Sequence, residues 1–136
     1  MPTDPVRRYL QYHYIAANPY AYASKKQDLT DADDGSAYSR VHKIYHRLFG
    51  KMVNIFGYVD VFLIDVETLD IVYSYQKTAE FATNLGNGPY ADTNLGQMVR
   101  ALRKAGDRDD FKVTDFEFYR PNLGQPMAFI GSPVDW

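Results

Sequence analysis

The sequence predicts an α+β fold, in which helices pack on an antiparallel sheet. Two segments have the apolar spacing of amphipathic helices, Ala37–Phe56 and Asn94–Ala105. Two other stretches each contain a pair of neighbouring strands: Tyr58–Ile64 with Ile71–Lys77, and Phe111–Tyr119 with Met127–Ile130. Strands that follow one another in pairs, instead of alternating with helices, favour an antiparallel sheet.

Length and composition limit the possible classes of protein. The 136 residues suffice for one domain, and we expect a single domain over residues 1–136. Within it, residues 1–35 supply an N-terminal helix and a polar loop, and residues 36–136 supply a helix and the sheet core. A net charge of −2 argues against a nucleic-acid partner. The absence of Cys excludes disulfides, Cys-ligated zinc and thiol catalysis.

The first helix is predicted over Pro5–Ala17. Pro5 suits a first helical turn, and Asn18-Pro19 ends the pattern. One stripe of this helix is apolar and contains Val6, Leu10, Tyr14 and Ala17. If that stripe were exposed, it would suit a homodimer contact.

The longest helix is predicted over Ala37–Phe56, with Ser36 or Ser39 as N-cap and Gly57 as a left-handed C-terminal residue. We expect its apolar face to point inward, with Val41, Ile44, Tyr45, Leu48, Met52, Ile55 and Phe56. His42 and His46 are four residues apart, but no third ligand joins them, so we expect a pair on the helix surface. The acidic loop Asp28–Asp34 does not fit a calcium loop, so we expect no metal site and no cofactor.

The central hairpin and the loop after it organise the candidate site. Tyr58–Ile64 is apolar in both phases and is therefore expected to be covered on both faces. On the second strand, Tyr73, Tyr75 and Lys77 fall on one face. The loop Thr78–Leu95 is long, and loops of this length in a compact domain are commonly functional or disordered. Its apolar residues favour a packed loop.

The remaining elements follow from cap and turn residues. Asp92 or Thr93 is expected to cap the helix Asn94–Ala105, and Gly106 follows its end. We expect Leu95, Met98, Val99 and Leu102 to face inward.

Four motifs in order resemble the extracytoplasmic Cache domains, also called PDC sensor domains, which are distantly PAS-like. The motifs are DGSAYSRVH from Asp34, FGYVDVFLID with DIVYS from Phe56, TNL with GPY and DTNLG from Thr83, and an Asp115-Phe116 pair before AFI and Ser132-Pro133. These domains occur in bacterial methyl-accepting chemotaxis proteins, sensor histidine kinases and cyclases. The resemblance implies a long N-terminal helix and a PAS-like antiparallel sheet of about five strands.

The resemblance also implies a ligand pocket over the central hairpin for a small organic molecule. Its expected residues are Tyr73, Tyr75, Lys77, Phe81, Thr83, Asn84, Tyr90, Asp92, Asp115 and Phe129. Phe81–Tyr90 would form a lid. Lys77 would supply the positive charge that an Arg carries in relatives that bind amino acids, and Asp115 would hold an ammonium group.

In such domains the chain continues past the Ser-Pro motif into another apolar strand, whereas this sequence ends at Trp136. We therefore expect the sheet to lack its last strand. We also expect the chain to be an excised piece of a larger receptor and to belong to its periplasmic part. It would reach the membrane only through segments outside this sequence.

Three functions remain open at this point. The first is a sensor domain of a transmembrane receptor. The second is a domain of the same kind of receptor that binds no ligand and serves dimerisation or structure. The third is an enzyme, which we do not expect because no nucleophile with a base, paired carboxylates or metal set is visible.

Overall fold

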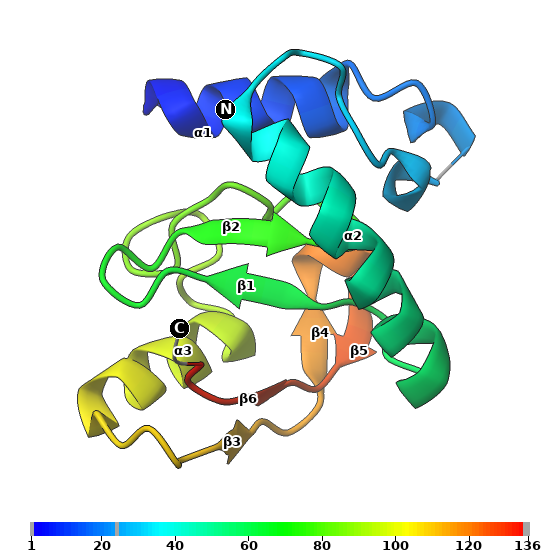
Figure 1. Cartoon of the computed structure of the whole chain (residues 1–136). Coiled ribbons are helices and arrows are strands. Elements are labelled where there is room, and N and C mark those ends of the chain that lie inside the picture. The colour runs from blue at the N-terminus through cyan, green and yellow to red at the C-terminus, as the bar shows by residue number, and fades with distance from the viewer. Residues whose placement is uncertain (1, 24, 135–136) are drawn as a thin grey trace. The chain divides into compact units, whose positions relative to one another are not determined.

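The computed structural model describes residues 2–23 and 25–134 of the chain. It confirms a mixed α+β protein with helices and small sheets (Figure 1). Short 3₁₀ turns lie at Ala21–Ala23, Lys26–Asp28 and Arg120–Asn122. The expected end of the sheet near Trp136 lies outside the described residues.

The chain divides into two compact units that are described separately below. The first unit contains residues 1–63 and 72–82, and the second contains residues 64–71 and 83–136. The central hairpin contributes residues to both. A single domain over the whole chain therefore stays a prediction.

The first helix is shorter than predicted and changes its winding. Helix α1 spans Pro5–Gln11 and continues as a π-helical turn over Tyr12–Ala16. Asp4 caps it by accepting a hydrogen bond from the backbone N–H of Arg7 at 2.9 Å. Of the predicted apolar stripe, Leu10 and Tyr14 are buried and Val6 is exposed. Ala17 is exposed as well, so half of the stripe belongs to the core.

Helix α2 has the predicted bounds, Ala37–Phe56, and the predicted caps. The Ser36 hydroxyl accepts from the N–H of Ser39 at 3.1 Å, and Gly57 is left-handed with φ of 70°. The prediction of its buried face is wrong. Six residues of the apolar stripe are exposed, namely Val41, Ile44, Tyr45, Leu48, Ile55 and Phe56. The buried face contains Ser39, His42, His46 and Val53 instead.

The central hairpin is also shorter than predicted. Strands β1 (Phe62–Ile64) and β2 (Ile71–Ser74) form a two-stranded sheet. The Asp60 carboxylate accepts from the N–H groups of Tyr75 and Gln76 at 2.9 and 3.1 Å. The Tyr75 N–H is shared with the Val61 carbonyl at 3.1 Å, and beyond this bond the carboxylate takes the place of a ladder partner. β1 is half-buried and Tyr58 and Val59 are exposed, so the expected cover on both faces is wrong.

Helix α3 spans Asn94–Ala105, as predicted. The Thr93 hydroxyl accepts from the N–H of Gly96 at 3.2 Å, and Gly106 is left-handed with φ of 66°. Leu95 and Met98 are buried as expected, while Val99 and Leu102 are half-buried.

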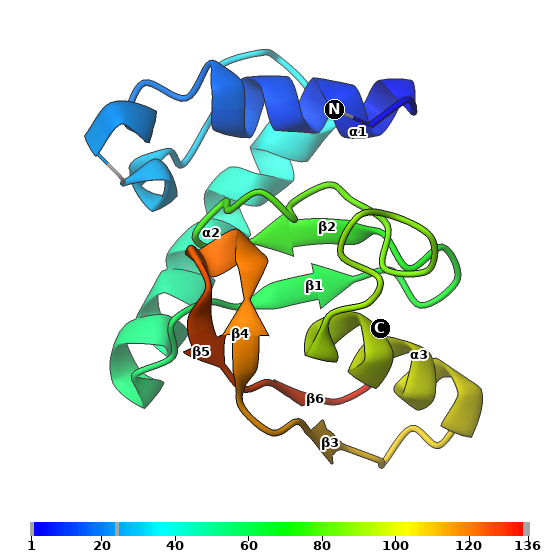
Figure 2. The same cartoon turned by 180° about the vertical axis from the view of Figure 1, so that it is seen from behind.

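The C-terminal hairpin is broken in its middle (Figure 2). β3 (Lys112–Val113) pairs with β6 (Ile130–Gly131), and β4 (Glu117–Tyr119) pairs with β5 (Gln125–Met127), both antiparallel. At the break, the Asn94 amide donates to the carbonyls of Asp115 and Met127 at 3.2 and 2.9 Å. In place of the two predicted strands, Phe111–Tyr119 and Met127–Ile130, the chain therefore forms four short ones. A single five-stranded sheet is not confirmed, because the described strands pair as three two-stranded ladders.

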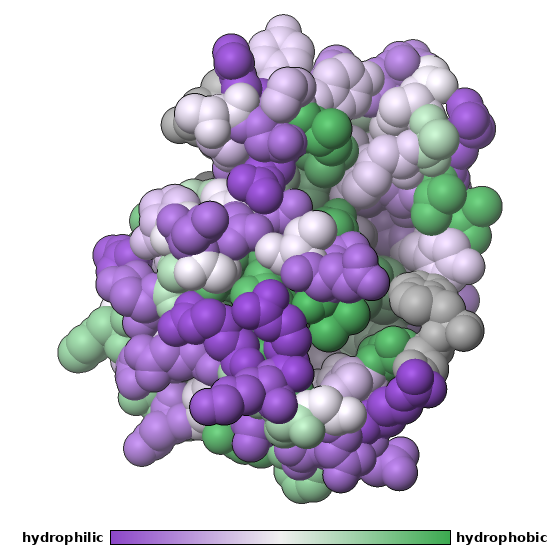
Figure 3. All heavy atoms as spheres, turned by 90° about the vertical axis from the view of Figure 1, so that its left-hand side faces the viewer, coloured by the Kyte–Doolittle hydropathy of each residue, from purple (hydrophilic) through white to green (hydrophobic). Residues whose placement is uncertain are grey.

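Many large apolar side chains are exposed along the described chain. On the face drawn in Figure 3, apolar areas are small and polar side chains interrupt them.

Candidate functional site

A buried lysine lies where strand β2 ends. The chain bends at Tyr75 and Gln76, and Lys77 adopts a left-handed backbone conformation with φ of 55°. Its N–H donates to the Ser74 hydroxyl at 2.9 Å, and its amine donates to the Ser74 carbonyl. Lys77 has no exposed surface. The prediction that Lys77 continues the strand face of Tyr73 and Tyr75 is therefore wrong.

Three aromatic rings surround the Lys77 amine. Its Nζ lies 4.3 Å from the ring centre of Tyr73, 5.3 Å from that of Phe81 and 5.7 Å from that of Tyr14. These distances fall within the range of cation–π attraction. We call Lys77 and these three rings the lysine cage. The cage joins Tyr73 and Phe81, which the sequence had placed in the site, to Tyr14 of the N-terminal segment, which it had not.

Burial determines the protonation of this amine. Removing an ammonium from water costs several kcal/mol, whereas cation–π attraction returns about 2 kcal/mol. No ion pair with Lys77 occurs among the described residues. Burial therefore lowers the pKa of Lys77 to about 7, and the charge of Asp60 opposes this only in part.

His42 and His46 are buried beside the cage, so the prediction of a surface pair is wrong. Each is 3% exposed, and their rings stack at 4.6 Å. His46 Nε2 donates to the Gln27 carbonyl at 2.6 Å, so its Nδ1 accepts from the Tyr73 hydroxyl at 2.7 Å. His42 Nδ1 donates to the Thr30 carbonyl at 2.8 Å. These partners come from distant segments and fix both tautomers.

Both histidines are held in the neutral form. Burial lowers the pKa of His42 to about 3, and the nearby charge of Lys77 acts in the same direction. Burial also lowers the pKa of His46, although the hydrogen bond to the Gln27 carbonyl raises it in part. The buried face of α2 therefore presents neutral imidazoles to the lysine cage.

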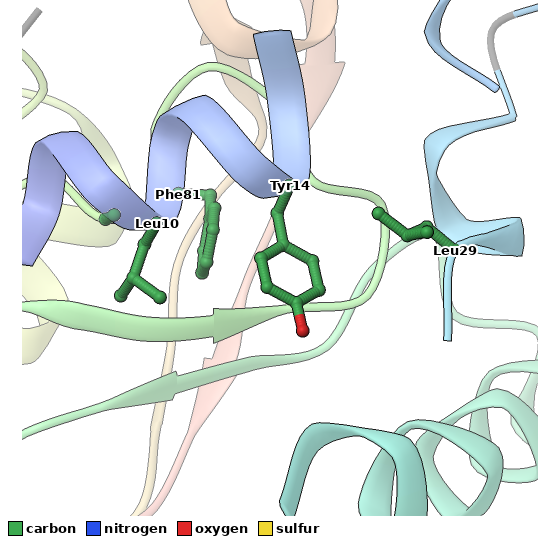
Figure 4. Packing of buried hydrophobic residues seen from close by; sticks show 5 residues of the cluster. Leu10, Tyr14, Leu29 and Phe81 are labelled. Atoms are coloured by element: carbon green, nitrogen blue, oxygen red, sulfur yellow. The ribbon is translucent and has the colours of Figure 1, made fainter. Parts of the chain in front are cut away.

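The cage is continuous with an apolar cluster (Figure 4). That cluster contains Leu10, Tyr14, Leu29, Phe81 and Ala82. The Tyr14 hydroxyl points toward α2, where it shares a hydrogen bond of 2.8 Å with Ser39. The Gln11 amide donates to the Phe81 carbonyl at 3.0 Å. Phe81 therefore packs as core of the first unit, not as part of an open lid.

Tyr75 lies next to this group but outside the cage. It is half-buried and its ring stacks on His46 at 5.0 Å. Close packing with α2 occurs at Gly50, where an added Cβ would lie 3.2 Å from the Tyr75 ring.

Six predicted site residues belong to the second unit, and two of them serve loop structure there. Thr83 and Asn84 are buried, and the Thr83 carbonyl accepts from the N–H of Ile71 at 3.0 Å. The Asn84 amide donates to the Thr68 carbonyl and the Asp70 carboxylate, and its oxygen accepts from the N–H groups of Gly86 and Asn87. Asn84 fixes the loop instead of presenting its amide to a ligand.

The other four are less buried. Asp92 pairs with Arg120 at 3.0 Å, and the Arg120 guanidinium also lies 5.7 Å from the Tyr90 ring. The hydrogen bond that Asp92 accepts from Arg120 lowers the pKa of the Asp92 carboxyl. Asp115 is exposed, and its carboxylate accepts from the adjacent N–H of Phe116. Phe129 packs edge-on against Tyr119 at 5.0 Å.

Residues 2–23 and 25–134 hold no group of three or more His, Asp or Glu side chains placed to bind a metal. No described helix is long and apolar enough to cross a bilayer. A shallow depression is lined by Pro5, Arg8 and Tyr9 of α1 and by Tyr12 of the π-helical turn after it.

In comparisons with known proteins, no family model matches the chain, and neither a curated protein nor a solved structure matches it.

Proposed function

We propose that this chain is the extracytoplasmic sensing domain of a bacterial transmembrane receptor of the chemotaxis-receptor or sensor-kinase type. We propose further that its short ladders belong to a PAS-like sheet of about five strands. The order of the four Cache-like motifs supports this assignment. The observation that carries the proposal is the convergence of Tyr73, Lys77 and Phe81 with both N-terminal helical segments.

A sensor must bind its ligand unequally in two states, and the buried cluster supplies a physical basis for this. Tyr14 follows α1, and His42 and His46 lie on α2. A ligand that changes the packing around Lys77 therefore acts on both helices at once. In a membrane receptor, helices of this kind transmit the change. Perturbed pKa values in one cluster are typical of functional sites.

A thermal-shift screen with organic acids, amino acids and amines tests the proposal. A compound present at 100 times its dissociation constant stabilises the protein by about 2.7 kcal/mol. We expect Tyr73→Phe to reduce the rise in melting temperature that such a compound causes. Tyr22→Phe should leave this rise unchanged, because Tyr22 is 90% exposed. A broad screen in which no compound raises the melting temperature would count against sensing of a small organic ligand.

The exposed apolar stripe of α2 favours a second candidate, a structural or dimerisation domain of such a receptor. Its side chains are 44–75% exposed, which is unusual for a helix of this amphipathicity. We expect Ile44→Gln with Leu48→Gln to dissociate such a dimer in sedimentation experiments, with Lys51→Gln as the control. A wild-type protein that sediments as a monomer at every concentration would exclude this candidate.

A further inference from the structure

The Lys77 amine contacts groups from every part of the first unit that surrounds it. Tyr14 comes from the π-helical turn after α1, Tyr73 and Ser74 from β2, and Phe81 from the following loop. The groups that interact with it electrically are His42 and His46 on α2 and Asp60 before β1. Glu80 in the loop acts on Asp60. A change of charge on this one nitrogen is therefore felt by both helical segments, the hairpin and the loop.

The lysine side chain itself fills the space between the three rings. The cage is closed to solvent at Lys77, Tyr14 and Phe81, each of which has no exposed surface. A proton needs no pocket of its own to bind this amine. Its binding is a simple transfer, in which the neutral amine and a proton from water give the ammonium.

We propose that the stimulus read by this cluster is the proton, and that Lys77 is a latch that holds the loop Tyr75–Ala82 under α1 and against α2. The proposal rests on the proposed function as a sensor domain and names its ligand. In the closed latch the amine is buried and Phe81 packs in the apolar cluster. In the open latch the amine is in water, and the loop no longer holds Phe81 in place.

Acidification opens the latch. In water the amine has its ordinary pKa of 10.5, and burial lowers the pKa to about 7 in the closed state. Between these values the open state binds one more proton than the closed state. Each unit by which the pH falls therefore raises the open-to-closed ratio about tenfold. Below about pH 7 both states carry the proton and the effect levels off.

The other titratable groups near Lys77 affect the opening of the latch mainly outside the range from about pH 7.5 to 9.5. The buried histidines favour opening below pH 6.5, and Asp60, whose pKa burial raises to about 6, acts in the opposite direction below that value. Burial raises the pKa values of Tyr14, Tyr38 and Tyr73 above their usual value of 10. Measurements between about pH 7.5 and 9.5 therefore report on Lys77.

Trypsin cleavage after Lys77 tests the latch in the wild-type chain, because the protease must take the lysine side chain into its own pocket. We would measure initial cleavage rates after Lys77 and after the exposed Lys25 by mass spectrometry. Cleavage after Lys25 corrects for the pH dependence of the protease. We expect the ratio of the two rates to rise about tenfold per unit as the pH is lowered from 9.5 to 7.5. A constant ratio would overturn the proposal.

A pair of matched variants supplies an independent measurement. Lys77→Met keeps a long apolar side chain in the cage but cannot bind a proton, and Lys104→Met makes the same change at an exposed position of α3. In urea unfolding, we expect the unfolding constant of the wild type and of Lys104→Met to fall as the pH rises from 7.5 to 9.5. The unfolding constant of Lys77→Met should also be measured over this range. The factor by which it changes should be at least tenfold smaller than the factor for the wild type.

If the unfolding constants of Lys77→Met and Lys104→Met depend equally on pH, the latch is contradicted. If Lys77→Met does not fold, the trypsin measurement alone tests the proposal. The outcome is distinct from that of the ligand screen. A failed screen with a steep trypsin ratio leaves the proton as the stimulus, and a successful screen with a constant ratio leaves a sensor without the latch.

Discussion

The hydrogen bond between Tyr73 and His46 offers the sharpest test of the buried cluster. The Tyr73 hydroxyl donates to His46 Nδ1 at 2.7 Å, and the other nitrogen of that ring is engaged with the Gln27 carbonyl. Tyr73→Phe removes the donor and leaves a buried acceptor without a partner. Such a loss costs about 1–3 kcal/mol. We therefore expect Tyr73→Phe to reduce the free energy of unfolding by about 2 kcal/mol.

Tyr75→Phe is the matched control in the same hairpin. Its ring stacks on the same histidine, but within the described residues its hydroxyl has no hydrogen-bond partner. Its removal should change the free energy by less than about 0.5 kcal/mol. Urea unfolding followed by circular dichroism measures both variants.

A double-mutant cycle isolates the bond itself. In a His46→Leu background, Tyr73→Phe should be milder by at least about 1 kcal/mol, because the acceptor is already absent. The reasoning fails if Tyr73→Phe is no more destabilising than Tyr75→Phe, or if the two changes at Tyr73 and His46 are additive.

Further predictions concern both units. Gly96→Ala should destabilise by about 3 kcal/mol in urea unfolding, since the added Cβ would lie 2.5 Å from the Ala91 carbonyl oxygen; a loss below about 1 kcal/mol would contradict this packing. Asn94→Ala should likewise lose about 3 kcal/mol, because two backbone carbonyls at the strand break lose their donor; an unchanged midpoint would show that the break does not depend on this amide. His42→Phe should lessen the loss of stability between pH 6.5 and about 3, where only the unfolded chain protonates this histidine, and parallel pH curves would refute that assignment. Asp92→Asn should leave the melting temperature unchanged, since its ion pair with Arg120 is exposed.

Helix ends could be predicted from the sequence because they depend on neighbouring residues. Gly57 and Gly106 follow the ends of α2 and α3 as predicted, and Ser36 and Thr93 are each one of the two N-cap residues that the sequence offered. Each cap forms within one helical turn, so no distant part of the chain is needed to define it.

The buried face of α2 could not be predicted in the same way. Apolar spacing identified the stripe of Ile44 and Leu48, but burial also depends on which distant groups satisfy polar side chains. His42 and His46 are buried because the carbonyls of Thr30 and Gln27 and the Tyr73 hydroxyl lie within hydrogen-bond distance. One signal was available: Ser39, His42, His46 and Val53 themselves follow helical spacing.

The strands and the candidate site were predicted only in part, for a related reason. Side chains of Asp60 and Asn94 interrupt ladders that strand propensity would continue. Tyr73, Lys77 and Phe81 do meet, but through a left-handed turn at Lys77 and not along a strand face. Tyr14 lies about sixty residues earlier in the chain, and nothing in its local pattern identified it as a partner.

The division of the chain into two units has a consequence for how the gene can be rearranged. The polypeptide passes from one unit to the other after Leu63, after Ile71 and after Ala82. A cut after Leu63 keeps the second unit in one fragment but separates Tyr73, Lys77 and Phe81 from the rest of the first unit, and a cut after Ala82 keeps the first unit but divides the second. A cut after Ile71 divides both units, so no single point of recombination or truncation separates the chain into two complete units.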